Sequence, residues 1–375
     1  MLICGRCGEM APDTNRFCQK CGFTLEEATP AQPAAQQNVY QQANDIFDGF
    51  SARLHRLAST DRLENFSISE MFSEVFRKRS PEEVEEYFLT GTSRATPPIE
   101  AVDTGWPKPW FFFRVLAFLL VVYFGFSAIM QFWGNAKAIP GMIIMGSLSF
   151  PLATLILFFE FNTPRNVTVA HIILLLSFGG MLSLVVTHIG VMMAALNWLG
   201  AMSAGIVEES AKLLTVIMLV RSAKFKYILN GLLFGAAVGA GFEVFEMAGY
   251  AFEQVMATKN LSVMEHEITL RALTAPFGHA AWTAISAGAL WRARAGRPLD
   301  ISMLWDARFL KTFLIPVGLH MFYNSPLPNP LFVKEAVVAV ASWIVILGLV
   351  QQGLKQVREE QQQVAQAILA GAATV

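Results

Sequence analysis

Charged residues are scarce in this chain of 375 residues. Asp, Glu, Lys and Arg make up 15% of the sequence, whereas a typical soluble domain carries about 25%. Hydrophobic residues reach 54%, and this balance excludes an ordinary soluble enzyme and a disordered chain. A strong excess of basic residues is also missing, because the formal net charge is −1, which argues against a nucleic-acid binder.

Cysteine is absent after Cys21, and the start of the chain lacks an export signal. No positively charged segment followed by an apolar stretch and a cleavage site opens the sequence. We therefore expect the N-terminal segment to lie in a reducing compartment, where thiols bind metal rather than form disulfides.

The cysteines that are present form the pattern CxxC-x10-CxxC, with a glycine after each pair. Four thiolates predict a closed tetrahedral Zn²⁺ site, which is structural rather than catalytic. A segment of about 25 residues cannot bury a core, so zinc would stabilise most of its fold. The pattern resembles the short zinc-ribbon family, and a redox pair or an iron–sulfur site are the alternatives. The predicted ligands are Cys4, Cys7, Cys18 and Cys21.

Polarity divides the chain into two parts. Residues 1–108 hold 11 Lys and Arg against 16 Asp and Glu, and residues 109–375 hold 17 against 13. The first part is typical of a soluble segment and the second of a membrane-embedded one. We predict a zinc ribbon at 1–25, a flexible linker at 26–60, an amphipathic juxtamembrane region at 61–108, a membrane domain at 109–355 and a C-terminal helical tail at 356–375.

Eight apolar segments are long enough to cross a bilayer, which predicts an all-α polytopic membrane protein. With the N-terminus inside, eleven Lys and Arg of the loops and tail fall on the cytoplasmic side and four on the outer side. Inner loops are normally the richer in both residues, so we predict that both termini are cytoplasmic. The predicted spans lie near residues 110–133, 140–160, 167–188, 198–220, 227–252, 270–291, 309–325 and 332–353.

Ionisable side chains inside predicted spans are costly and are usually functional or paired. Four spans place such groups at a similar height in the outer half of the membrane, which independent ion pairs would not require. Groups three or four residues apart share a helix face. The residues are Glu208, Glu209 and Lys212 on the fourth span, Glu243 and Glu246 on the fifth, His279 on the sixth, and His320 and Asn324 on the seventh.

In chain order these residues form EExxK, FExxE, a lone histidine and HxxxN. Over residues 198–325 the combination resembles the PrsW family of intramembrane proteases, which is related to the CAAX-protease and bacteriocin-processing group. The resemblance implies an endopeptidase of a bacterial inner membrane, acting on membrane-anchored proteins such as tethered anti-sigma factors. It also implies that the pair Glu208 and Glu209 carries the catalytic carboxylate.

Peptide hydrolysis inside a membrane needs a water, a base that activates it and donors for the oxyanion. Glu208 and Glu209 are the candidate bases, and Lys212 would keep one of them ionised. His279 and His320 would bind the water, donate to the oxyanion or protonate the leaving amine. The remaining groups would orient the histidines, add a donor or share a proton: Asn324, Glu243 and Glu246.

The sequence leaves open whether a second zinc binds in the membrane. Glu with two His is a known catalytic zinc set, but the sequence contains no HExxH, so its ligands would converge from different helices. We favour a metal-free site. If a metal binds, the candidate ligands are Glu208, Glu243, His279 and His320.

Two other functions are compatible with the same residues. Proton- or ion-coupled transporters also use buried Glu and His chains, although we find no internal repeat of the kind that many transporters have. A non-catalytic membrane scaffold would leave the cluster vestigial. The ribbon would recruit a cytoplasmic protein partner or form a folded cap, and the acidic balance of residues 1–108 argues against nucleic acid as a partner.

Overall fold

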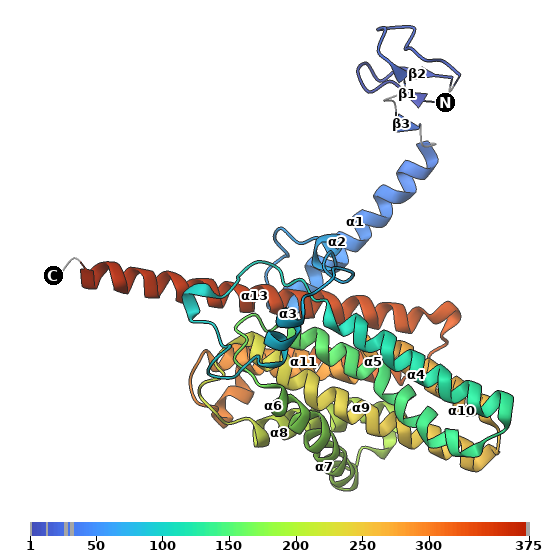
Figure 1. Ribbon diagram of the computed structural model, residues 1–375, viewed down its shortest axis with the longest axis vertical. Coiled ribbons are helices and arrows are strands. Elements are labelled where there is room, and N and C mark those ends of the chain that lie inside the picture. The colour runs from blue at the N-terminus through green and yellow to red at the C-terminus, as the bar shows by residue number, and fades with distance from the viewer. Residues whose placement is uncertain (1, 13, 26–28, 31–33, 373–375) are drawn as a thin grey trace. The chain divides into compact units, whose positions relative to one another are not determined.

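The computed structural model describes residues 2–12, 14–25, 29–30 and 34–372. The chain divides into two units, Met1–Arg53 and Leu54–Val375 (Figure 1).

The N-terminal unit contains a small antiparallel sheet. Strand β1 (Leu2–Ile3) lies between β2 (Met10–Ala11) and β3 (Thr29–Pro30). The side chains that pack at its centre include two of the four cysteines, which is how a segment this short holds together. The buried set is Cys4, Ala11, Cys18 and Leu25.

Helix α1 (Ala34–Leu57) follows the sheet. The sequence predicts a flexible linker at 26–60, but from residue 34 onward the described part of that segment is mostly helical. The sequence allows this, since 34–48 contains neither proline nor glycine and is rich in Ala and Gln, which favour helix.

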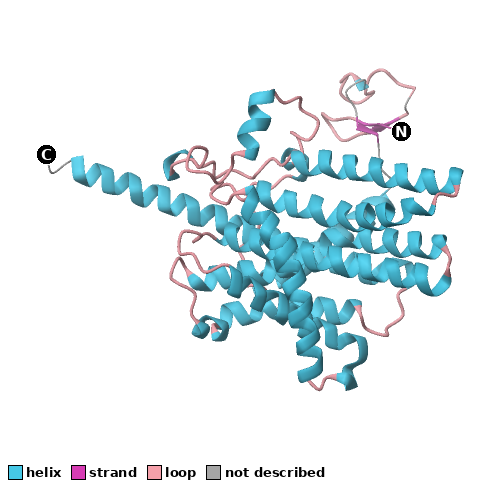
Figure 2. Ribbon diagram, turned by 60° about the horizontal axis from the view of Figure 1, so that its bottom comes forward, coloured by secondary structure: helices cyan, strands magenta, loops and turns pink. Residues whose placement is uncertain are grey.

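The second unit is a helical bundle, in which the helices lie side by side and loops join them at both ends (Figure 2). A π-helical segment, Leu175–Gly179, joins α6 to α7. The helices are α2 (Ile68–Met71), α3 (Pro81–Phe88), α4 (Phe111–Trp133), α5 (Ile139–Phe161), α6 (Val169–Leu174), α7 (Gly180–Met193), α8 (Ser203–Leu219), α9 (Ile228–Thr258), α10 (Leu261–Thr274), α11 (His279–Arg294), α12 (Ala307–Tyr323) and α13 (Val333–Ala372).

Five helical segments in the described part of the chain are long and apolar enough to cross a membrane. The other three predicted spans coincide with α8, α11 and α12, which have 17, 16 and 17 residues. These lengths are at or below the lower end of what a spanning helix needs, about 17 to 25 residues. The count of eight spans stays a prediction. The five segments are Phe111–Trp133, Ala136–Phe161, Val169–Met193, Ile228–Thr258 and Pro330–Ala370.

The sequence predicts one continuous sixth span at 270–291, but in the structure this segment is interrupted. Helix α10 ends at Thr274, a 3-10 turn covers Ala275–Phe277, and α11 begins at His279. Pro276 cannot donate a backbone hydrogen bond, and Gly278 has φ −91° and ψ −136°, which is not helical. The break puts His279 at the first turn of α11.

Helix α13 unites the eighth predicted span and the predicted tail at 356–375. It runs from Val333 to Ala372 without interruption. Two of its residues also hold the turn before α11 and the start of α11 itself: Trp343 Nε1 donates to Pro276 O at 3.1 Å, and Ser342 Oγ accepts from Trp282 Nε1 at 3.2 Å.

Helix α9 lies at the centre of the bundle and meets α11 through glycines. A Cβ on Gly235 would lie 2.2 Å from Thr283 O, and one on Gly239 would lie 2.3 Å from His279 O. Only glycine permits this approach of the two backbones. Glu243, one turn beyond Gly239, therefore faces the start of α11, where a Cβ on Gly278 would lie 2.9 Å from Glu243 Oε1.

The start of α4 is held by a carboxylate from α5. Glu160 accepts hydrogen bonds from the backbone N–H groups of Trp110, Phe111 and Phe112 at 2.7, 2.9 and 3.1 Å. These donors have no partner inside their own helix, so the carboxylate satisfies them. Helix α4 is otherwise loosely packed, because only 17% of its most apolar stretch is buried in the bundle.

Candidate active site

A cavity of about 480 Å³ opens among helices α8 to α12. Six of the eight predicted site residues line it, and the other two, Glu209 and Lys212, lie fully buried behind them. The break between α10 and α11 and the glycine contact of α9 bring these residues together. The lining residues from the predicted set are Glu208, Glu243, Glu246, His279, His320 and Asn324.

Lys212 forms the buried centre of the site. Its Nζ lies 2.6 Å from Glu209 Oε1, 2.7 Å from His279 Nδ1 and 3.7 Å from Glu208 Oε2. The Phe242 ring lies 4.4 Å from the same ammonium. Because an ammonium group only donates, Nδ1 of His279 must accept, and the ring proton lies on Nε2.

The two adjacent glutamates have different surroundings. Glu209 Oε1 contacts both Lys212 and His320 Nδ1, the latter at 3.0 Å, and its side chain is 0% exposed. The Oε2 atom of each glutamate is buried without a hydrogen-bond partner among the described residues, but only Glu208 lines the cavity. Glu208 is therefore the member of the pair that is available to a water in the cavity.

His320 is fixed in one orientation from two sides. A carboxylate only accepts, so Nδ1 of His320 donates to Glu209. The Trp282 ring stacks on the imidazole with centroids 4.6 Å apart. The free Nε2 then faces Glu208 Oε2 at 4.0 Å. A single water between these two atoms would hydrogen-bond to both.

His279 is held by a chain of charged groups that leads to α10. Its Nε2 lies 3.1 Å from Glu246 Oε2, which also accepts from Arg271 Nη1 at 3.3 Å. Arg271 Nε donates to Glu267 Oε1 at 2.5 Å, and its guanidinium lies 3.8 Å from the centre of the Tyr250 ring. The guanidinium thus bridges two carboxylates and fixes the one that orients His279.

Glu243 and Asn324 occupy the edges of the cavity. Glu243 is 6% exposed, and its Oε2 is buried without a hydrogen-bond partner in the described structure. Asn324 follows the last turn of α12, and its Nδ2 donates to Ala201 O at 3.3 Å. One N–H of this amide remains for a ligand in the cavity.

Comparison with known proteins identifies a family over the part of the chain that builds this cavity. The model of the PrsW family intramembrane metalloprotease matches residues 151–350. The chain belongs to the PrsW family. The matched segment contains all eight predicted site residues, and the apolar helices make this PrsW chain an integral membrane protein. No curated protein and no solved structure matches it.

The PrsW family is described as one of metalloproteases, and three side chains of this cavity fit a metal ion. One donor atom each of Glu208, His279 and His320 lies within 4.8 Å of the others, and these are ligand types that catalytic zinc takes. Glu208 Oε2, which has no hydrogen-bond partner among the described residues, supports the fit. A cation bound to Nδ1 of His279 would have to displace the Lys212 ammonium. Glu243, a fourth candidate in the sequence, is not part of this group.

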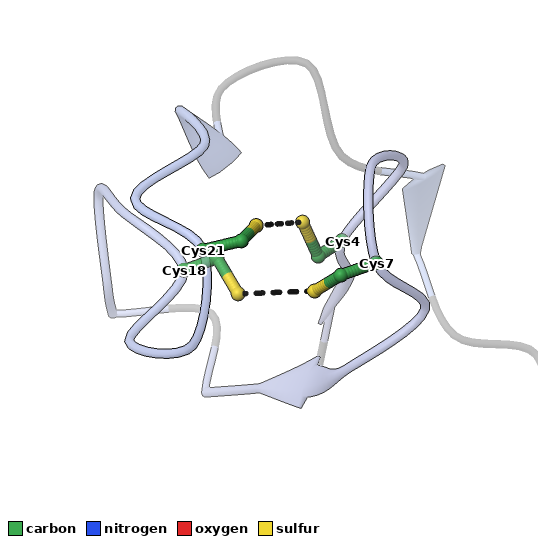
Figure 3. Close-up of side chains that lie close together, drawn as sticks. All are labelled: Cys4, Cys7, Cys18 and Cys21. Atoms are coloured by element: carbon green, nitrogen blue, oxygen red, sulfur yellow. Dashed lines mark hydrogen bonds between the residues drawn. The ribbon is translucent and has the colours of Figure 1, made fainter.

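The four cysteines of the N-terminal unit also converge (Figure 3). Cys4 Sγ lies 3.5 Å from Cys21 Sγ, and Cys7 Sγ lies 3.6 Å from Cys18 Sγ. Zinc–sulfur bonds of about 2.3 Å place the sulfurs of a tetrahedral site somewhat less than about 4 Å apart. The predicted ligands therefore have the spacing of a structural zinc site.

Four residues around the cavity are absent from the predicted site: Arg271, Glu267, Tyr250 and Trp282. Arg271 belongs to the four Lys and Arg that the prediction places on the outer side. The spacing of Glu267 and Arg271, i,i+4, could have indicated an ion pair. Nothing local in the sequence marks Tyr250 or Trp282, because each acts through a residue of another helix, Arg271 of α10 and His320 of α12.

Proposed function

We propose that this chain is an intramembrane endopeptidase that cuts a membrane-anchored protein near the outer end of its span, with Glu208 as the base. The observation that carries the proposal is the Glu208 Oε2 atom, which lies in the cavity wall 4.0 Å from His320 Nε2 and has no hydrogen-bond partner among the described residues. Family membership favours proteolysis over transport or a scaffold role.

In the proposed reaction, a water lies between Glu208 Oε2 and His320 Nε2, which are 4.0 Å apart. Glu208 takes one proton as the water oxygen attacks the scissile carbonyl carbon. The C–N bond then breaks, and the same proton passes to the leaving amine nitrogen. Asn324 Nδ2 supplies a donor for the oxyanion.

The second glutamate has a positioning role in this scheme. Glu209 accepts a hydrogen bond from the Nδ1–H group of His320, which leaves Nε2 of His320 free for the water. Lys212 compensates the charge of Glu209 and holds His279, while Glu246 holds the same ring from its other nitrogen. These contacts keep the cavity side of the site in one arrangement.

The ammonium of Lys212 already provides a cation beside Glu208, Glu209 and His279, and for this reason we assign the reaction a metal-free mechanism. A zinc held by Glu208, His279 and His320 would polarise the scissile carbonyl.

Outside the cavity, we propose that Cys4, Cys7, Cys18 and Cys21 bind one structural zinc. The excess of Lys and Arg in the inner loops supports cytoplasmic termini, and we place the chain in a bacterial inner membrane because it belongs to the PrsW family. With the termini placed there, the ribbon would recruit a cytoplasmic protein partner.

The proposal is tested on cells that carry either the wild-type chain or a Glu208→Gln variant at equal abundance. The N-termini of their membrane proteins are compared. We expect new N-termini at the outer end of a single-span protein with the wild-type chain alone. Glu253→Gln, a change of an exposed glutamate on α9, should behave as wild type. Identical N-termini in the wild-type and Glu208→Gln cells under several envelope stresses would refute the proposed activity.

A further inference from the structure

A second cavity, of about 540 Å³, lies on the other side of α10. Helices α4 and α10 form its walls, and α5 contributes Gly146, Ser149 and Phe150. Because α4 is mostly unburied, with Phe124 62% exposed, the cavity is a groove on the surface of the bundle that faces lipid. Its volume admits one face of a helix rather than a whole helix, whose diameter is about 10 Å.

The groove carries a polar stripe in otherwise apolar walls. Gln131 Nε2 donates to Ser127 Oγ at 3.0 Å, and Ser127 Oγ donates to Glu265 Oε1 at 3.0 Å. Ser127 lies six residues before the end of α4, which is about 9 Å along the helix. A carboxylate at this depth is costly next to lipid chains, which cannot donate a hydrogen bond.

Helix α10 separates this groove from the catalytic cavity. Its residues Glu265, Ile268 and Ala272 line the groove, whereas Arg271 and Thr274 line the catalytic cavity. The helix has only 14 residues, about 21 Å. It lies between two interruptions, a left-handed residue at Lys259 with φ 54° and the non-helical Gly278. A substrate segment that moves from the groove to the proposed water beside Glu208 must therefore pass α10.

We propose that the groove between α4 and α10 docks the transmembrane helix of the substrate, and that α10 is the wall past which the scissile segment reaches the cavity. The occupant is an apolar helix with a donor side chain, such as Asn, Gln or Lys, at the depth of Glu265. Such a donor complements the carboxylate, which a lipid chain does not. The inference rests on the proposed function, because only a protease needs this route.

The docking test uses a photo-reactive phenylalanine analogue in the full chain carrying Glu208→Gln. The probe is the single-span protein whose new N-terminus the comparison of cells identifies. Placed at Phe124 in the groove, the analogue should cross-link to the span of that protein. Phe118 is the matched control, because it is the same residue type on α4, is 65% exposed and lies outside the groove.

The outcomes separate the two proposals. A cross-link at Phe124 at least fivefold stronger than at Phe118 supports docking in the groove. Cross-links to phospholipid or to a second copy of the chain alone, while the wild-type chain cleaves the probe, overturn the docking site and leave the proposed function intact. Absence of cleavage by the wild-type chain overturns both.

A reversible lock tests the role of α10. A Cβ on Gly146 would lie 2.5 Å from Ile268 Cγ2, so Gly146→Cys with Ile268→Cys removes that clash and puts two thiols within disulfide reach. We expect the oxidised double variant to cleave at least tenfold more slowly than the same protein after reduction. The single-cysteine variants control for the ribbon thiols. Equal cleavage by the oxidised and reduced double variant would show that α10 is not the barrier.

Discussion

Lys212 Nζ lies 2.7 Å from His279 Nδ1, and the lysine side chain is 0% exposed. The same ammonium compensates Glu209 at 2.6 Å, so Lys212→Met would leave a buried carboxylate without its cation. Such a change costs about 3–5 kcal/mol. We expect a large fall in the melting temperature of the detergent-purified protein together with loss of cleavage.

The double variant Lys212→Met, Glu209→Gln is the control for this effect. It removes both charges, and the amide oxygen still accepts from His320, so most of the stability should return while cleavage stays low. A Lys212→Met protein that melts as wild type would contradict the buried pairing.

Gly239→Ala should distort the site from within α9. The new Cβ would lie 2.3 Å from His279 O, and neither backbone can yield without moving Glu243 or His279. Overpacking of this kind costs about 1–3 kcal/mol. We expect cleavage to fall at least tenfold and the melting temperature to decrease. Gly249→Ala on the same helix meets nothing within 4 Å and should be silent in both measurements.

Metal analysis of the full chain distinguishes the two zinc sites. We expect one zinc per chain, held by the ribbon, and none after all four cysteines are changed to serine. A zinc that survives the four serine substitutions and disappears when His279→Ala is added would place a metal in the catalytic cavity and replace the metal-free mechanism.

Arg271→Gln should slow the chemical step, because Glu246 would lose the guanidinium that holds it against His279. We expect kcat to fall about tenfold with little change in KM, and Arg271→Lys to recover part of the rate. Lys259→Gln, an exposed cation at the end of α9, is the matched control. A change confined to KM would instead indicate that Arg271 binds substrate.

The sequence predicts the apolar helices and the polar residues that gather around one cavity, because both depend on strong local signals. Long apolar runs define helices such as α4, and a polar group such as His320 stands out against them. The pattern that matches the PrsW family also lies inside the helices that build the cavity, and the family prediction is confirmed.

The roles within the site could not be predicted in the same way. Glu208 and Glu209 are identical in type and adjacent in sequence, and only tertiary contacts direct one to Lys212 and the other to the cavity. Arg271 joins the site because the chain breaks at Pro276 and Gly278, whereas the apolar pattern predicts one continuous span there. Composition predicts a tail separate from the eighth span, but a change from apolar to polar residues does not end a helix, and α13 continues through both.

The unbroken course of α13 has a mechanical consequence. Its forty residues form a rod of about 60 Å. Near one end, Trp343 and Ser342 grip the turn and helix that carry His279, and the other end is an exposed polar extension. A stiff helix tilts as one body. A force applied to the C-terminal extension would therefore displace the turn and helix that carry His279, which lines the cavity.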